Sequence, residues 1–274
     1  MKGPLTRHRR LKVAFAVLVV LTWLLPVYWL LNVALKTQAQ LYVAEPSFIF
    51  TPTLENFSLA INRFGILWNA LNSFIIAAGS TALTLVFATL LVYGLTRFRF
   101  RLRNPILIWI LNLRMLPPIV IVIPYYIVYS RVGLIDTHIG MIIAYLPLTL
   151  PLAVWLLYGF ALEMPKSIDE AARIDGANRW QVFRDMMLPL MKPAIAVAGT
   201  FCFLEVWNEF TLALILTGGR TKTVPIGMSQ FLTEHSIEWG PMAAAALMLL
   251  IPLLAVTYFL QRSLVRGLTL GAVR

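Results

Sequence analysis

Six long runs of apolar residues restrict this chain to an all-α, membrane-spanning fold. A helix needs about 20 predominantly apolar residues to cross the hydrocarbon core of a bilayer. A transmembrane β-barrel would instead show short segments in which apolar and polar residues alternate. The runs are continuous, so we expect one transmembrane domain of six helices over residues 1–274. The expected spans are residues 13–35, 72–95, 105–129, 140–162, 193–216 and 241–260.

The composition supports a membrane protein and argues against other classes. Hydrophobic residues make up 59% of the 274 residues and charged residues only 13%. The hydrophobic fraction is too high for a soluble domain, and the charged fraction is too low for a disordered chain. One cysteine cannot form a disulfide framework, and the three histidines lack metal-ligand spacing. No G-x-x-x-x-G-K-[ST] loop and no known catalytic motif occurs. We therefore expect no catalytic residue, metal site or nucleotide site in this chain.

The distribution of basic residues predicts the orientation. Seventeen of the 23 Lys and Arg residues fall on the side of the N-terminus and five on the opposite side, when Arg114 is counted inside a span. Cytoplasmic loops carry the excess of positive charge, so both termini, the loop 163–192 and the tail 261–274 are expected in the cytoplasm. The basic residues lie between apolar runs, which excludes a nucleic-acid surface. The first run exceeds the length of a signal-peptide core, so we interpret it as an uncleaved span.

The cytoplasmic loop carries the signals of two short helices in tandem. Ser167 and Glu170 have the spacing of a capping box at the start of the first helix, and Gly176 supplies its end. Asn178 with Gln181 repeats the start signal, and Pro189 is expected to close the second helix. Apolar residues recur along both helices at three- and four-residue steps. This helix–Gly–helix segment, which we call the elbow, docks on a partner or lies against its own spans or the lipid headgroups.

The elbow sequence resembles the EAA motif of permease subunits of ABC importers. Met186 stands where that pattern usually has Ile, which is a mild departure because both residues are apolar. The resemblance rests on Glu170, Ala171, Ala172, Asp175, Gly176, Ala177, Phe183, Leu188 and Pro189, together with the apolar Met186 in the position of the usual Ile.

The resemblance extends to the carbohydrate-type branch of these permeases, the maltose-permease-like smaller subunits, and it covers nearly the whole chain. It includes residues 133–137, Trp207-Asn208 and the terminal residues 266–273. The resemblance implies a multi-pass subunit of the bacterial or archaeal cytoplasmic (inner) membrane with the type I ABC importer fold.

The same resemblance implies partners and roles for particular segments. The elbow would dock on a homodimeric ATP-binding subunit that holds ATP and Mg²⁺, and the tail (Arg266, Gly267, Gly271) would reach toward it. The outer segment 218–240, with Gly218, Met228, Phe231 and Trp239, would contact an extracytoplasmic solute-binding protein. A second, non-identical permease and membrane lipid complete the expected surroundings.

Polar residues inside the spans are candidates for a substrate pathway, because ionisable groups at membrane depth are costly and usually face a bundle or a wet path. Arg114 lies in the third run, and Glu205, Asn208 and Glu209 in the fifth are spaced to share one helical face beside Trp207. Carboxylates and amides pair with sugar hydroxyls, and an indole covers the apolar side of a sugar ring. The alternative is structural, with Arg114 neutralising Glu205 or Glu209 across the bundle.

We therefore expect the permease subunit of a binding-protein-dependent ABC importer for a sugar or polyol. A non-sugar cargo, such as a polyamine or an anion, remains an alternative. The EAA motif indicates docking on an ATP-binding subunit and carries no information about the transported solute. An ion-coupled secondary transporter would predict repeated halves, and none is found in the sequence. A membrane enzyme or scaffold would need a catalytic constellation or no transport at all.

Overall fold

The structure is mostly helical, as the continuous apolar runs predict. The computed structural model describes residues 7–43, 48–233 and 236–270. Within these residues the only strand-like pairing is one isolated antiparallel bridge between Leu232 and Ile237. The chain divides into two units, Met1–Ile66 with Met228–Pro252 and Leu67–Gly227 with Leu253–Arg274.

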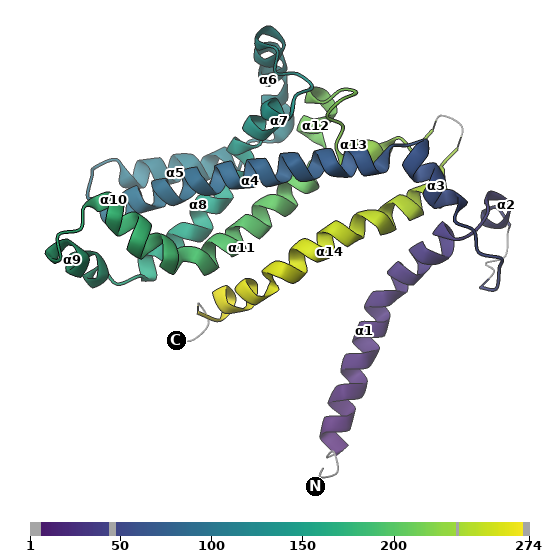
Figure 1. Ribbon diagram of the computed structural model, residues 1–274, viewed down its shortest axis with the longest axis horizontal. Helices are drawn as coiled ribbons and strands as arrows, with labels where there is room; N and C mark the ends of the chain where they lie inside the picture. The colour runs from purple at the N-terminus through teal and green to yellow at the C-terminus, as the bar shows by residue number, and fades with distance from the viewer. Residues whose placement is uncertain (1–6, 44–47, 234–235, 271–274) are drawn as a thin grey trace. The chain divides into compact units, whose positions relative to one another are not determined.

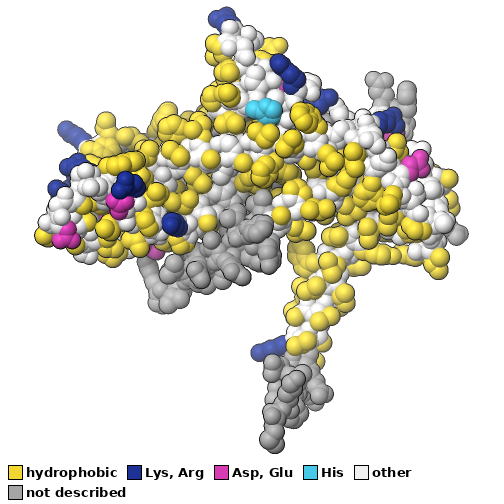
Figure 2. Space-filling model, viewed as in Figure 1, with side chains coloured by type: hydrophobic (Ala, Val, Ile, Leu, Met, Phe, Trp, Pro, Cys, Tyr) yellow, Lys and Arg dark blue, Asp and Glu magenta, His cyan; other side chains and the backbone are white. Residues whose placement is uncertain are grey.

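The first unit contains the N-terminal helix and the segments packed on it. Its helices are α1 (Arg7–Ala34), α2 (Gln38–Leu41), α3 (Glu55–Asn62) and the beginning of α14 (Trp239–Leu270). Asn56 of α3 is buried where α3 meets the end of α1. Its side-chain amide donates to the carbonyls of Ala34 (2.9 Å) and Lys36 (2.7 Å). The apolar side chains of α1 are exposed from Leu11 to Trp29 (Figure 2), as a lipid-facing helix requires.

The second unit is a bundle in which α4, α5, α8 and α11 lie alongside one another (Figure 1). Small residues line its core, including Ala88, Ala153, Ala161 and Ala198, and they let helix backbones approach closely in a membrane. The helices are α4 (Ile66–Arg97), α5 (Arg103–Leu113), α6 (Pro118–Val132), α7 (His138–Ala144), α8 (Leu146–Glu163), α9 (Ser167–Ile174), α10 (Arg179–Gln181), the π-helix η1 (Val182–Met187), α11 (Leu188–Trp207), α12 (Thr211–Leu216) and α13 (Val224–Ser229).

The predicted spans lie in helical structure, although not all of them are single straight helices. Four helices of the described chain are long and apolar enough to cross a membrane, α5 and α6 form a pair bent by 92°, and Trp239–Ala255 is a shorter apolar helix. The bend follows from Pro117 and Pro118, because proline has no amide hydrogen to continue a helix and Pro117 is extended. The fourth run is divided between α7 and α8, and the fifth between α11 and α12.

A buried contact between two threonines joins α4 to α8. The hydroxyls of Thr84 and Thr149 are 2.6 Å apart, and both residues are fully buried. Thr149 donates to the carbonyl of Tyr145 (3.0 Å), so Thr84 is the donor in the interhelical bond.

Replacing Thr84 with valine is expected to lower the free energy of unfolding by about 1 kcal/mol, the usual size of an interhelical hydrogen bond in a membrane protein. Unfolding of the detergent-solubilised chain measures this loss. Thr89→Val is the matched control, because the Thr89 hydroxyl bonds only carbonyls of its own helix. Equal losses in the two variants would contradict a role for the bond between helices.

Candidate functional site

The elbow turns at a glycine, as predicted. α9 ends at Ile174, and Gly176 follows in the left-handed conformation at φ +87°, which glycine adopts without steric cost. Asn178 and Gln181 form the predicted capping box: the Asn178 amide donates to Gln181 Oε1 (2.7 Å) and the Gln181 amide to Asn178 Oδ1 (2.9 Å). Both signals therefore place the second helix of the elbow correctly.

Two details of the predicted elbow are wrong. Ser167 makes no capping hydrogen bond, because Lys166 stands at the N-cap and Ser167 is already the first helical residue. Pro189 does not end the second helix, since the chain continues without a break from η1 into α11. In the π-turn the Leu188 amide donates to the carbonyl of Phe183, five residues back. Pro189 then lies in the first turn of α11, where a missing amide hydrogen is tolerated.

Four contacts fix the elbow to the end of α4. Arg97, the last residue of α4, forms an ion pair with Asp169 of α9. The Tyr93 hydroxyl donates to the carbonyl of Arg179 (2.9 Å), and the Tyr93 ring lies 5.1 Å from that of Phe183. The Arg179 guanidinium lies over the ring of Phe98 at 4.6 Å. Burial raises the pKa of Asp169, and the charge of Arg97 opposes that shift.

The predicted docking residues separate into buried and exposed sets. Ala172 and Phe183 are buried and hold the elbow to its own unit. Ile174, which lies outside the predicted docking set, is 86% exposed at the end of α9. The exposed predicted residues are Glu170, Ala171, Asp175, Gly176 and Pro189, whereas Ala177 and Leu188 are half-buried. The elbow thus presents small residues beside the carboxylates of Glu170 and Asp175, together with three exposed apolar side chains, those of Ile174, Trp180 and Met186.

A shallow hollow of about 240 Å³ lies inside the turn of the elbow. Asp175, Gly176 and Ala177 form one side, and Gln181, Asp185 and Met186 form the other. Its floor carries no large side chain because of Gly176 and Ala177, so a partner's side chain has room to enter.

The candidate pathway residues do not share one helical face. α11 ends at Trp207, and the chain is not helical again until Thr211, so Glu209 leaves the register that the spacing predicted. Arg114 pairs with Glu205 at 3.3 Å, which confirms the structural contact given as the alternative. Asn208 is exposed at the end of α11 and donates to the carbonyl of Leu204 (2.7 Å).

Glu209 and Trp207 make internal contacts. The Glu209 carboxylate accepts from the amides of Thr211 (2.8 Å) and Leu212 (3.1 Å) at the start of α12, and the Tyr145 hydroxyl donates to it (3.1 Å). Trp207 is buried and stacks on Phe203, with ring centroids 5.7 Å apart. Of the five candidates, Arg114 and Asn208 are exposed, Glu205 and Glu209 are half-buried, and Trp207 is buried.

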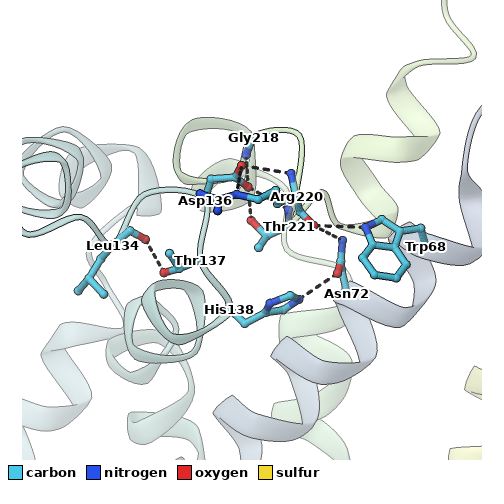
Figure 3. A network of polar contacts seen from close by, with 9 residues as sticks. All are labelled: Trp68, Asn72, Leu134, Asp136, Thr137, His138, Gly218, Arg220 and Thr221. Carbon is cyan, nitrogen blue, oxygen red and sulfur yellow. Dashed lines mark hydrogen bonds and ion pairs between the residues drawn. The ribbon is translucent and has the colours of Figure 1, made fainter.

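A polar clamp, centred on Asp136, closes the opposite end of the second unit (Figure 3). Asp136 Oδ1 accepts from the amides of Gly218 (2.9 Å) and Thr221 (2.9 Å) and from the Thr221 hydroxyl (2.7 Å), and Oδ2 accepts from the Arg220 amide (3.1 Å). Burial alone would raise the pKa of Asp136, but these hydrogen bonds outweigh it and lower the pKa to about 2. The clamp ties the α6–α7 loop to the segment after α12.

A second layer of contacts ties the same segment to α4. His138 Nε2 lies 2.9 Å from Asn72 Oδ1, and the Asn72 side-chain amide donates to the carbonyls of Arg220 (3.0 Å) and Lys222 (3.1 Å). Trp68 Nε1 also donates to the Arg220 carbonyl (3.4 Å) (Figure 3). In the sequence, Asp136 stands out only as part of residues 133–137 of the family resemblance, because a lone aspartate carries no local signal for amides more than 80 residues away.

The residues proposed for the outer segment have different surroundings. Gly218 lies against the clamp, where a Cβ would come within 2.8 Å of Asp136 Oδ2. In the first unit, Phe231 is fully buried beside Phe64, with ring centroids 4.2 Å apart, whereas Met228 is half-buried and Trp239 is exposed. Arg266 and Gly267 of the proposed tail contact lie in α14, and Gly271 lies outside the described residues.

Comparisons with known proteins agree with this architecture. The family model described as binding-protein-dependent transport system inner membrane component matches residues 85–270. The chain is 33% identical over 276 residues to the trehalose/maltose transport system permease protein of Thermococcus litoralis, covering 97% of each chain. It is 33% identical over 257 residues to the trehalose transport system permease protein of Mycobacterium tuberculosis, covering 92% of each.

A solved structure shows the same fold over almost the whole chain. It is that of a bacterial ABC transporter involved in the import of the acidic polysaccharide alginate. The TM-score is 0.75 at 20% sequence identity, and the match covers 95% of this chain and 99% of that chain. The segment that the family model matches contains the elbow, Arg114, the Asp136 clamp and Asn208.

Proposed function

Because this chain belongs to the family of binding-protein-dependent transport system inner membrane components and is a permease subunit of an ABC importer, we propose that it carries a sugar or polyol across the membrane. The direction is inward, across the cytoplasmic membrane of a bacterium or archaeon. The observation that carries the proposal is the elbow: an exposed knuckle of small residues fixed by Arg97, Tyr93 and Phe98 to a membrane-spanning helix.

The elbow is proposed to receive force from a separate ATP-binding subunit. Glu170, Ala171 and Gly176 are exposed for docking, and the sequence offers no phosphate-binding loop of its own. ATP and Mg²⁺ would therefore be bound by two copies of that partner. Closure of the partner dimer would press on the elbow and shift the bundle between inward-open and outward-open states, an equilibrium that nucleotide and loaded binding protein both bias.

A second, non-identical permease and an extracytoplasmic binding protein complete the proposed importer. The path for the cargo would lie between two permease bundles, of which this chain supplies one. The expected contacts with the binding protein come from the segment after α12, where the clamp fixes the backbone around Gly218.

The pairing of Arg114 argues for a neutral cargo. An unpaired arginine at membrane depth would attract an anion, but the Glu205 carboxylate lies 3.3 Å from the Arg114 guanidinium and offsets its charge. Both relatives described above are named for uptake of a disaccharide, trehalose or trehalose and maltose. These two observations together favour a sugar over a polyamine or an anion.

Reconstitution of the complete importer tests the proposed function. The complex, with its binding protein, is placed in liposomes, and uptake of labelled disaccharides, polyols, polyamines and inorganic anions is compared with ATP and without it. We expect ATP-dependent uptake of a sugar or polyol. ATP-dependent uptake confined to a polyamine or an anion would overturn the cargo, and uptake that follows an ion gradient without ATP would overturn the importer itself.

Replacing Asn208 with alanine is expected to lower uptake by about three- to tenfold, the worth of one hydrogen bond to the cargo, while the complex still assembles. The Asn208 side chain is exposed and bonds only a carbonyl of its own helix. Uptake kinetics and size-exclusion chromatography of the complex measure the two effects. Asn62→Ala is the matched control, since the exposed Asn62 bonds only Ser58 within α3. Loss of assembly in the Asn208 variant would instead indicate a structural role.

A further inference from the structure

A basic hollow of about 400 Å³ lies where α4 meets the elbow. Arg97, Arg99, Arg173 and Arg179 line it, together with a single carboxylate, Asp169. Four guanidinium groups against one carboxylate leave three net positive charges around a space of this size. These like charges repel one another, and an anion bound among them would offset the repulsion.

Arg97 has an unsatisfied donor inside this hollow. Its side chain is only 7% exposed, and its Nε forms the ion pair with Asp169. Its Nη2, in contrast, is buried and has no hydrogen-bond partner in the described part of the chain. A buried guanidinium nitrogen without an acceptor costs free energy, so the hollow lacks the acceptor that this nitrogen requires.

The other arginines leave charge available for the same ligand. Among the described residues, Arg99 and Arg173 have no carboxylate within ion-pair distance. The guanidinium of Arg179 lies over the ring of Phe98, with Cζ 4.6 Å from the ring centroid, which holds Arg179 at the wall of the hollow. Forked guanidinium donors match the oxygens of a phosphate group in pairs.

We propose that this hollow binds a phosphate group, supplied by the headgroup of an anionic phospholipid. α4 spans the membrane and ends at Arg97, so the hollow opens at the level of the lipid headgroups. Tyr93, one turn before the end of α4, also lines the hollow, and tyrosine is enriched where a spanning helix meets the membrane interface. Basic pockets beside the cytoplasmic ends of spanning helices hold such headgroups. The bound phosphate would bridge Arg97 of α4 and Arg173 of α9, and the site does not depend on which cargo is carried.

Lipid binding to the purified full chain tests the proposal. The chain in neutral detergent is titrated with short-chain phosphatidylglycerol, with diacylglycerol, which lacks the phosphate, and with inorganic phosphate, and bound molecules are counted by native mass spectrometry. We expect phosphatidylglycerol to bind and diacylglycerol not to bind. Arg97→Gln should weaken phosphatidylglycerol binding about tenfold, as expected for a charge-assisted contact, and Arg99→Gln about fivefold.

Arg99→Gln and Arg101→Gln separate a specific site from general attraction and from misfolding. Arg99 is exposed and unpaired, so its loss leaves the fold intact even if Arg97→Gln does not fold. Arg101 lies two residues further along but does not line the hollow, and its replacement should change binding less than twofold. Equal weakening by Arg99→Gln and Arg101→Gln would overturn the proposal.

Two further outcomes identify the source of the phosphate. Competition by inorganic phosphate at the same arginines, with no preference for phosphatidylglycerol, would keep the anion site but overturn the lipid as its occupant. Unchanged phosphatidylglycerol binding, together with weaker association of the Arg99 variant with the ATP-binding subunit, would assign the hollow to an acidic segment of that partner and overturn the proposal. The lipid-binding measurement and the uptake measurement are independent. If phosphatidylglycerol does not bind but ATP-dependent sugar uptake is observed, the lipid site is wrong and the proposed function still holds.

Discussion

Replacing Asp136 with alanine is expected to lower the free energy of unfolding by about 3 kcal/mol, because three backbone amides and one hydroxyl lose their shared acceptor. The carboxylate accepts from the amides of Gly218, Arg220 and Thr221 and from the Thr221 hydroxyl. Asp136 also has a φ of 54°, a left-handed conformation that aspartate tolerates better than alanine. Both effects act in the same direction, and the segment after α12 should detach from the α6–α7 loop.

The same carboxylate makes stability depend on pH. Its pKa falls from the ordinary 3.8 to about 2 in the folded chain, so the folded state favours the ionised form. This stabilisation, on the order of 2 kcal/mol, is fully present above about pH 4 and is lost as the pH falls toward 2. The alanine variant should lose this pH dependence.

Unfolding of the detergent-solubilised chain between pH 2 and pH 7 measures both expectations. Asp136→Asn retains one acceptor oxygen but no charge, and it should fall between the wild-type chain and the alanine variant. Thr221→Val removes one of the four donors and should cost about 1 kcal/mol. A wild-type stability in the alanine variant, or an unchanged pH profile, would show that the clamp does not stabilise the fold.

Replacing Gly176 with valine is expected to reduce ATP-driven uptake by about tenfold or more. The glycine has a φ of +87°, and a left-handed conformation costs an L-residue about 1–2 kcal/mol, with a higher cost for a β-branched side chain. No atom lies within 4 Å of a Cβ built at this position, so the effect arises from the backbone and not from a clash. The turn should open, and the exposed residues of α9 and α10 should lose their relative placement.

Two controls isolate the conformation of the turn. Asn tolerates the left-handed region, so Gly176→Asn should retain most of the uptake. Gly133→Val imposes the same kind of backbone strain, because Gly133 has a φ of +72° and no atom within 4 Å of an added Cβ. Gly133 follows the end of α6, away from the elbow, so this variant should keep the coupling between ATP hydrolysis and uptake. Uptake and cargo-stimulated ATP hydrolysis in liposomes distinguish these cases. Wild-type coupling in Gly176→Val would contradict the proposed role of the elbow.

The features that the sequence predicted correctly depend on local chemistry or on the bilayer. Continuous apolar runs specify helices because a bilayer offers no partner for a free backbone amide. Gly176 and the pair Asn178 and Gln181 act within one turn of the chain, and the structure confirms both. The family resemblance, based on residues of the elbow, is confirmed by the match over residues 85–270.

The features that the sequence did not predict depend on contacts distant in the chain or on small shifts in register. Lys166 takes the N-cap in place of Ser167, and a π-turn carries the helix through Pro189. The end of α11 at Trp207 removes Glu209 from the expected face, because its carboxylate caps α12 instead. Asp136 finds its partners more than 80 residues away, which periodicity cannot reveal.

The π-turn at η1 has a mechanical consequence. Because η1 joins the elbow to α11 without a loop, the 20 residues of α11 form a continuous helical connection about 30 Å long between the elbow and Asn208. Under the proposed function, a displacement of the elbow by the ATP-binding subunit would reach Asn208 at the other end of α11, because no flexible loop lies between them. The chain is not helical between Trp207 and Thr211, so under the proposed function a movement driven by ATP hydrolysis would be taken up in this gap, beside the exposed amide of Asn208.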